Sequence, residues 1–142
     1  MKKVADVLAR KSRHLIYVVP ATTVLDALKI MSDNNIGSIL VMENGEYRGI
    51  MTERDYARKV ILKGKSSTDT QVKEIMSIDL PSISSETSIE ECMQLMSVNN
   101  IRYLPVFHGH ELTGIISVND VIKAVIASQA ETISHLHTYI NS

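Results

Sequence analysis

The chain has 142 residues, of which 44% are apolar and 22% charged, a composition that is ordinary for a globular protein and excludes a wholly disordered chain. The net charge of −1 gives no bulk attraction to nucleic acid or to an anionic membrane, so we expect neither as a partner. Cys92 is the only cysteine, which excludes an internal disulfide and fits a reducing, cytoplasmic location. The first residues lack the apolar run of a signal peptide, whereas a transit sequence removed before residue 1 is left open.

An internal repeat is the strongest pattern in the sequence. Residues 18–60 align with residues 83–125 at a constant offset and without gaps. Within them MSDNNI meets MSVNNI, and Asp55 meets Asp120. We therefore divide the chain into a first repeat (4–62), a polar linker (63–71), a second repeat (72–127) and a C-terminal helical extension (128–142).

In the first repeat, a short helix near residue 4 is followed by an extended segment at 15–19. A helix then starts after Thr23, where Asp26 three positions later gives a pattern similar to a capping box. Strands are expected at 38–42 and 47–51, because Asn44-Gly45 between them favours a type I′ hairpin turn. A second helix begins at Thr52.

The second repeat follows the same order. Its expected elements are an extended segment at 80–83, a helix after Ser88, strands at 103–107 and 112–116 joined by a turn at 108–110, and a helix from Ser117. Each repeat thus reads β-α-β-β-α, and about 60 residues cannot bury a sufficient core alone. We predict an α/β fold in which the two repeats pack as a pseudo-two-fold pair.

The last helix is expected to continue from residue 118 toward Ile140. Ile133, Leu136, Tyr139 and Ile140 recur there at helical spacing. An exposed apolar stripe of this kind needs a partner, which favours a homodimer contact.

The repeated unit contains GIMTERD at 49–55 and GIISVND at 114–120. With these segments the chain resembles the cystathionine-β-synthase (CBS) domain family over residues 4–127, and the pair resembles a Bateman module of the stand-alone two-CBS regulatory proteins. The resemblance implies an adenosine-containing ligand in clefts between the repeats, and dimers in many members. We expect AMP or NAD(H) first, because each offers the adenosine ribose and at least one phosphate, and ATP next.

Thr52 with Asp55, and Ser117 with Asp120, each follow a strand and open a helix. One interpretation is a plain helix cap, in which the hydroxyl accepts a backbone N–H. A helix N-terminus also suits a phosphate, and a carboxylate can accept both hydroxyls of a ribose. The resemblance implies that Asp55 and Asp120 hold the ribose, with Thr52 and Ser117 near the phosphates.

Arg102 falls where the family often places a basic residue that faces phosphates, and Gly37 stands at the aligned position of the first repeat. The two clefts are therefore expected to differ. Arg102 is alternatively a surface salt-bridge residue, and Tyr103 either lines the cleft or packs at the sheet edge. Arg54, inside the first motif, reaches a phosphate or pairs with a nearby acid.

The resemblance also implies apolar walls for the adenine. Ile16 and Ile36 would serve the cleft of Asp120, and Pro81 and Ile101 would serve the cleft of Asp55. For each of these residues, ordinary core packing is the alternative.

The sequence shows no metal-ligand cluster, activated nucleophile or paired acid and base, so we expect no enzyme, no catalytic residue, no metal site and no catalytic cofactor. The favoured function is a sensor that signals an adenine nucleotide to an effector protein, which the sequence does not identify. The alternatives are a dimerisation or scaffold module with a vestigial cleft, and, less favoured, a nucleotide-hydrolysing enzyme.

Overall fold

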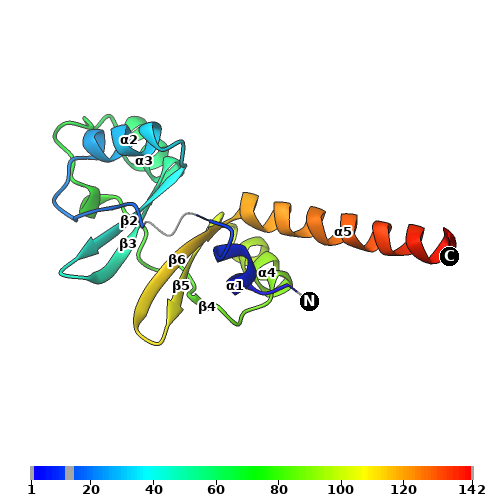
Figure 1. Cartoon of the computed structure of the whole chain (residues 1–142). Coiled ribbons are helices and arrows are strands. Elements are labelled where there is room, and N and C mark those ends of the chain that lie inside the picture. The colour runs from blue at the N-terminus through cyan, green and yellow to red at the C-terminus, as the bar shows by residue number, and fades with distance from the viewer. Residues whose placement is uncertain (1, 12–14, 142) are drawn as a thin grey trace. The chain divides into compact units, whose positions relative to one another are not determined.

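The computed structural model describes residues 2–11 and 15–141, with residues 139 and 141 described in their backbone only. The chain forms two compact units. Unit 1 comprises Met1–Arg13 and Pro81–Ser142, and unit 2 comprises His14–Leu80. Each unit has its own sheet and helices (Figure 1). The sheet of each unit has three strands, and each unit has its own apolar core.

Unit 2 contains the strands and helices of the first repeat. They are β1 (Tyr17–Val18), α2 (Val24–Asp33), β2 (Ser38–Glu43), β3 (Glu46–Thr52), α3 (Glu53–Lys59), and the 3-10 turns η1 (Ile61–Lys63) and η2 (Val72–Glu74). β1 pairs parallel to β2, which pairs antiparallel to β3. Asn44 and Gly45 have φ of 54° and 77°, so the type I′ turn expected from Asn-Gly is formed.

Unit 1 repeats this order. Its elements are α1 (Val4–Leu8), β4 (Ile83–Ser84), α4 (Ile89–Asn99), β5 (Tyr103–His108), β6 (Glu111–Ser117) and α5 (Val118–Asn141). β4 pairs parallel to β5, and β5 antiparallel to β6. The predicted α/β fold with two repeats, each a mixed three-stranded sheet with helices, is confirmed.

Two elements of the second repeat have bounds that differ from those predicted. The strand expected at 80–83 pairs only at Ile83 and Ser84. Pro81 has no N–H to donate to a ladder, which fits the late start. The second hairpin turn is shorter than expected, because His108 pairs with Glu111 and only Gly109 and His110 remain as turn residues.

The opening segments of the two repeats are exchanged between the units. Val4 and Val7 of α1 lie in the core of unit 1, with the second repeat, and the Val4 N–H donates to the Thr87 carbonyl at 2.9 Å. Val72 and Ile75 lie in the core of unit 2, with the first repeat. The repeats in the sequence and the compact units therefore begin at different places.

The aligned glycines Gly49 and Gly114 mark where these exchanged segments cross the sheets. A Cβ on Gly49 would lie 2.8 Å from the Ser77 carbonyl oxygen, closer than real contacts allow. A Cβ on Gly114 would lie 3.1 Å from a methyl group of Leu8. Glycine at these two positions therefore permits a close approach of another part of the chain.

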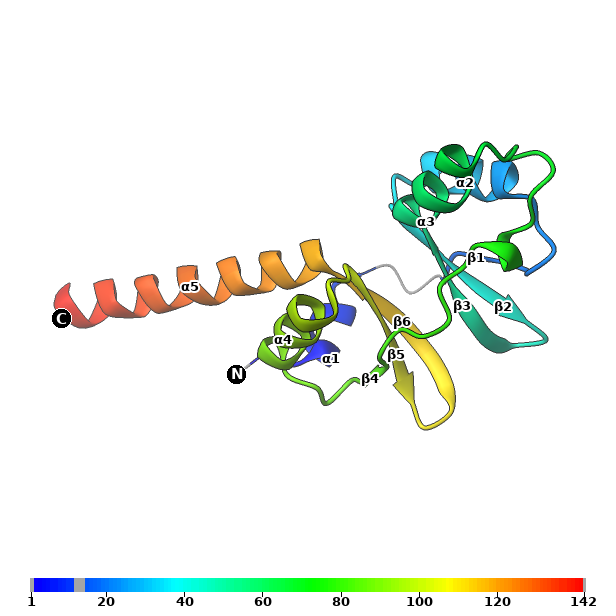
Figure 2. The ribbon, with the colours of Figure 1, turned by 180° about the vertical axis from the view of Figure 1, so that it is seen from behind.

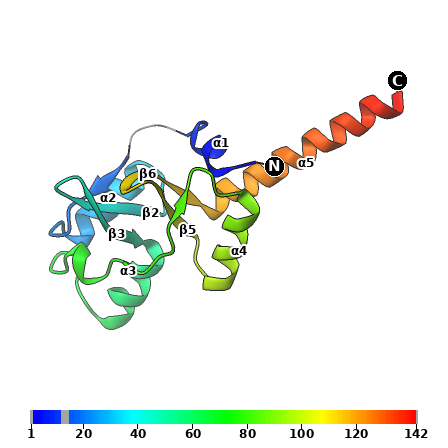
Figure 3. The same cartoon turned by 90° about the horizontal axis from the view of Figure 1, so that it is seen from below.

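Helix α5 belongs to unit 1 and continues past the rest of that unit (Figures 1 and 2). Its first turns pack between α1 and α4, which flank it in Figure 3. Val121 and Ala124 are buried there, whereas Ile133, Leu136 and Ile140 are exposed by 56%, 56% and 76%. The expected long helix with an unpartnered apolar stripe is present.

Candidate functional site

The two Thr/Ser-x-x-Asp motifs form the same backbone arrangement in both repeats. The Asp55 N–H donates to Thr52 Oγ1 at 3.0 Å, and the Thr52 N–H donates to Asp55 Oδ2 at 3.0 Å. In the second repeat the Asp120 N–H donates to Ser117 Oγ at 3.2 Å, and the Ser117 N–H donates to Asp120 Oδ2 at 2.8 Å. The helix-cap interpretation therefore holds in both copies, and each motif forms a reciprocal capping box.

The carboxylate of Asp55 is enclosed by donors beyond its own cap. The Ser77 hydroxyl donates to it at 3.0 Å, and the Lys59 ammonium lies 3.0 Å from Oδ1. The Thr52 hydroxyl lies 3.0 Å from Oδ2. Only 6% of Asp55 is exposed. Both oxygens are thus already engaged, and a ribose could bind Asp55 only by displacing one of these donors.

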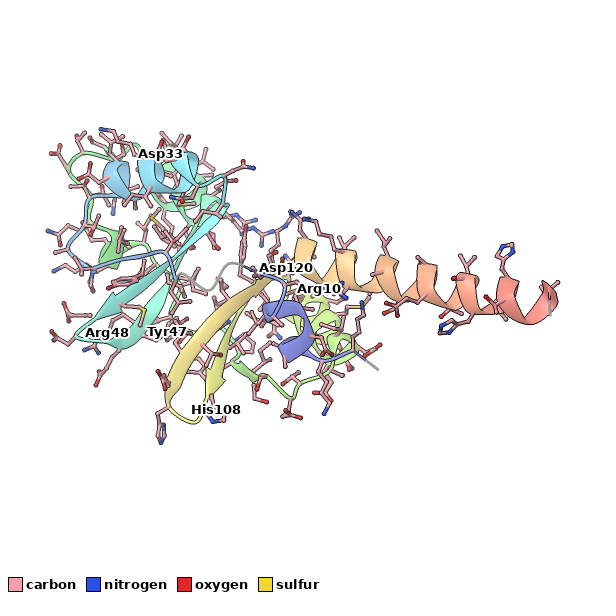
Figure 4. All side chains as sticks on the ribbon, in the orientation of Figure 1. Arg10, Asp33, Tyr47, Arg48, His108 and Asp120 are labelled. Atoms are coloured by element: carbon pink, nitrogen blue, oxygen red, sulfur yellow. The ribbon has the colours of Figure 1, made fainter. Side chains whose placement is uncertain are left out.

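Asp120 is placed differently, although its cap is the same. The Lys11 ammonium lies 2.8 Å from Oδ2 and also donates to the Ile115 carbonyl at 2.9 Å. Within the described residues no hydrogen bond reaches Oδ1, and the Asp120 side chain is 17% exposed. Asp120 therefore offers one carboxylate oxygen to a ligand at the start of α5 (Figure 4).

The ionisation of Asp120 reflects this environment. Burial raises the pKa of its carboxyl, but the hydrogen bonds from Lys11 and Ser117 and the charge of Lys11 lower it more, so the pKa lies below its ordinary value. The group is a stable anion at neutral pH. It can accept hydrogen bonds from a diol but has no proton to donate.

The difference between the two carboxylates traces to two aligned positions. In the second repeat Ala124 stands where the first repeat has Lys59. In the exchanged opening segments, Ala9 stands where the other segment has Ser77. Alanine has no donor, so Asp120 lacks both of the side chains that close Asp55.

Arg102 and Gly37 lie directly beside the motifs. Their carbonyls accept the first N–H of the following helix, from Val118 at 2.9 Å and from Glu53 at 3.1 Å. The Arg102 side chain is exposed and forms no salt bridge within the described part of the chain, so the alternative of a surface ion pair has no partner there. The predicted difference between a cationic and a glycine position therefore lies directly beside the two motifs, with Arg102 next to the second and Gly37 next to the first.

The remaining predicted residues are half-buried. Tyr103 begins β5 and Arg54 lies in the first turn of α3. Ile16 and Ile36 pack against the core of unit 2, and Ile101 packs against the core of unit 1. These contacts support the alternative of core packing. The assignment of Ile16 and Ile36 to Asp120, and of Pro81 and Ile101 to Asp55, joins residues of different units and stays a prediction.

Lys11, Ser77 and Lys59 were not predicted as partners of the two carboxylates. A signal for Lys59 existed, because Asp55 and Lys59 are an i,i+4 pair on one helix face. No local signal could indicate Ser77, which is 22 residues from Asp55, or Lys11, which is 109 residues from Asp120.

Other candidate groups are placed away from this chemistry. Cys92 is fully buried in the core of unit 1, and burial raises the pKa of its thiol to about 11. Across residues 2–11 and 15–141, no three or more His, Cys, Asp or Glu side chains are grouped to hold a metal. The same residues include no helix with the length and apolar character needed to cross a bilayer.

Comparison with known proteins identifies the family. The family model of the CBS domain matches residues 4–62 and 72–127. The mitochondrial CBS domain-containing protein CBSX3 of Arabidopsis thaliana is 41% identical over 123 residues, which cover 83% of this chain but only 60% of that protein.

Solved structures agree with the family model. A protein with CBS domains from Burkholderia ambifaria MC40-6 is 42% identical, with a TM-score of 0.86 over 90% of this chain and 96% of that one. The CBS domain pair of protein MJ0100 has the same fold at 23% identity, with a TM-score of 0.79 over 90% of this chain and 98% of that one. The chain belongs to the CBS domain family and contains two CBS domains in tandem.

Proposed function

We propose that this protein is a non-catalytic regulatory sensor that binds an adenine nucleotide at the Asp120 motif and passes the signal to a partner protein. The observation that carries the proposal is the half-buried, ionised Asp120 carboxylate, which keeps one oxygen open at the start of α5. A carboxylate in this state can accept the two hydroxyls of a ribose. The matching carboxylate of Asp55 is closed by Ser77 and Lys59.

The relatives support a ligand of this class. The CBS domain pair of MJ0100 was solved in complex with 5′-methylthioadenosine and S-adenosyl-L-methionine, both of which contain adenosine. The name of the Burkholderia ambifaria protein suggests signal transduction. For this chain the ligand candidates are AMP, NAD(H) and ATP, with Arg102 directed to the phosphates and Ile16 and Ile36 to the adenine.

A bound ligand can act as a signal only if its binding is linked to a conformational equilibrium of the protein. A ligand shifts an equilibrium between two arrangements only through its different affinity for them. We propose that occupation of the Asp120 motif favours one arrangement of the two CBS domains, which the effector protein distinguishes. The proposal includes no catalytic step. The cytoplasmic location also stays a prediction, since the Arabidopsis relative is named as mitochondrial.

A thermal-unfolding screen tests the ligand. The purified chain is heated with AMP, ADP, ATP, NAD+, NADH or S-adenosylmethionine, beside the variants Asp120→Asn and Asp55→Asn. A ligand at 100 times its Kd adds about 2.7 kcal/mol of stability, which raises the midpoint by roughly a few degrees. We expect Asp120→Asn to remove this shift and Asp55→Asn, the matched control, to retain it.

Three results of this screen would contradict the proposal. If no nucleotide changes the midpoint at millimolar concentration, the scaffold interpretation becomes the better account. If Asp55→Asn removes the shift and Asp120→Asn retains it, the ligand occupies the other motif. Nucleotide recovered as a hydrolysed product after incubation would instead support the enzyme alternative.

We further propose that α5 mediates a homodimer. Its exposed positions Ile122, Ile126, Gln129, Ile133, Leu136 and Ile140 alternate at spacings of four and three, as in the seam of a two-stranded coiled coil. Lys123 and Glu131 are the only Lys, Arg, Asp or Glu residues between 121 and 141, so the face meets little charge repulsion. An isolated helix projecting into water is marginal, which favours a second copy as its cover.

Sedimentation of the purified chain tests the dimer. We expect Leu136→Glu to produce monomers, because it places a carboxylate in the apolar seam. Ser134→Glu adds the same charge away from the seam and should leave the dimer intact. A wild-type chain that sediments as a monomer at all concentrations would contradict the proposal and assign the helix face to the effector.

A further inference from the structure

A pocket of about 270 Å³ lies between α1 and the first turns of α5, entirely within unit 1. Four cationic side chains line it: Lys2, Arg10, Lys11 and Lys123. The acidic residues in its wall are Asp6 and Asp120. The pocket thus has more positive than negative side chains, although the whole chain has a net charge of −1.

Each acidic residue of the pocket already has a hydrogen-bond or ion-pair partner. Asp6 accepts the Lys3 N–H at 2.9 Å and so caps α1, and Asp120 is paired with Lys11. Within the described residues, Lys2, Arg10 and Lys123 form no salt bridge. Three unneutralised cations around one hollow repel each other, and a bound anion relieves that repulsion.

The side chains also have the geometry that phosphates require. Arg10 presents a planar guanidinium that can donate two parallel hydrogen bonds, and lysines act as mobile point charges. Arg10 follows α1 two residues after its end and lies near Asp120 in Figure 4. Asp120 and Lys123 are three residues apart on α5. The cations therefore reach the pocket from two separate parts of unit 1, the segment around α1 and the first turns of α5.

The size of the pocket limits the ligand. Sites that enclose whole small molecules measure roughly 300–1,000 Å³, so a pocket of about 270 Å³ is suited to a phosphate chain rather than to a complete nucleotide. We propose that this pocket binds a chain of phosphate groups. Because Asp120 lines the same pocket, the inference rests on the proposed function in one respect: the chain belongs to the nucleotide whose ribose is held by Asp120.

The proposal changes the expected ligand. A single phosphate next to Asp120 reaches only part of the pocket, whereas a triphosphate extends toward Arg10 and Lys123. ATP should therefore bind more tightly than AMP, the reverse of the order favoured from the sequence. Free inorganic polyphosphate has the same chemistry, so the experiment must separate the two sources.

Isothermal titration in magnesium-free buffer provides the test. The full chain is titrated with tripolyphosphate, adenosine, AMP and ATP, beside the double variant Arg10→Gln/Lys123→Gln. The matched control, Lys63→Gln/Lys65→Gln, removes the same charge from exposed positions of unit 2. The replaced side chains are exposed in both variants, and unchanged unfolding midpoints confirm that each one is folded.

We expect the double variant to weaken ATP and tripolyphosphate by about tenfold or more, and AMP by clearly less, because two charge-assisted contacts to the distal phosphates are lost. The control should leave all affinities nearly unchanged. Equal losses in the two variants would show general charge attraction and overturn the proposal. An unchanged ratio of ATP to AMP affinity in the double variant would overturn it too.

The outcomes also separate this inference from the proposed function. If adenosine and AMP bind through Asp120 while the double variant changes nothing, the pocket is not a phosphate site and the sensor remains. If tripolyphosphate and ATP bind equally well through Arg10 and Lys123 while adenosine and AMP do not bind, the phosphate site stands and the adenosine sensor is wrong.

Discussion

Unit 1 and unit 2 contain the same motif at the starts of corresponding helices, α5 and α3, yet the two carboxylates have different neighbours. Asp55 in unit 2 accepts Ser77 and contacts Lys59, and it is almost fully buried. Among the residues that the structure describes, Lys11 is the only side chain that contacts Asp120 in unit 1 beyond its cap, and Asp120 remains partly exposed. The backbone geometry of the motif is common to both, so the difference lies outside the motif.

The two copies of the motif keep the same cap while their carboxylates have different surroundings. The capping box requires only a hydroxyl and a carboxylate three residues apart, and both copies keep it. How far the carboxylate is enclosed depends on two further positions, which are Lys59 and Ser77 in one unit and Ala124 and Ala9 in the other. A motif alone therefore does not distinguish a helix cap from a ligand site.

The largest effect is expected from removing the enclosed carboxylate. Asp55→Ala leaves Lys59, Ser77 and the Thr52 N–H without their acceptor, and we expect a loss of about 2–3 kcal/mol in the free energy of unfolding, allowing for the partial exposure of Lys59. Asp120→Ala should lose about 1 kcal/mol. Urea unfolding measures both, and equal losses would refute the difference between the two environments.

The aligned glycines give the next contrast. Gly49→Ala brings a Cβ to 2.8 Å from the backbone oxygen of Ser77, which cannot move without breaking its strand contacts. We expect a loss of about 2 kcal/mol. Gly114→Ala meets a methyl group of Leu8 at 3.1 Å, and rotation of that side chain should limit the loss to less than about 1 kcal/mol. Thermal unfolding of both variants checks the order, and a larger loss at Gly114 would contradict it.

Replacing the two partners of Asp55 tests how much Lys59 and Ser77 contribute to stability at this site. In Lys59→Ala/Ser77→Ala the capping box with Thr52 remains, so we expect a loss of only about 1 kcal/mol. A loss as large as that of Asp55→Ala would mean that the cap contributes little and that Lys59 and Ser77 carry the stability. The measurement is the midpoint of urea unfolding at neutral pH.

The smallest effect concerns pH. The folded pKa of Asp120 lies below its unfolded value of 3.8, so the folded state binds fewer protons in this range. Its contribution to stability is present above pH 3.8 and is lost as the pH falls through the lower folded pKa. We expect the difference in unfolding free energy between wild type and Asp120→Asn to shrink in that window. A difference that does not change with pH would show that Lys11 does not stabilise the ionised form.

The elements were predictable because their signals are local. The Asn44-Gly45 turn and the caps at Thr23 and Ser88 depend on residues within four positions of each other, and the structure forms them as expected. The repeat also placed Asp55 and Asp120 at helix starts.

The partners of these carboxylates were not predictable in the same way. Lys11 meets Asp120 across 109 residues of sequence, and this contact exists only because the opening segments are exchanged. A periodic pattern identifies which face of a helix is buried, but not which segment covers it. The unequal closure of the two motifs therefore emerged only from the structure.

The exchange of opening segments also sets the order in which the chain can fold during its synthesis. Val4 leaves the ribosome well before Leu104 and Ile116, which belong to the same core and are added much later. At 5–20 residues per second, roughly a hundred intervening residues take about 5–20 s, during which residues 14–80 can close around their own core. Helix α1 is thus made before the core that buries it, and a nascent chain halted after residue 80 presents Val4 and Val7 with no core to receive them.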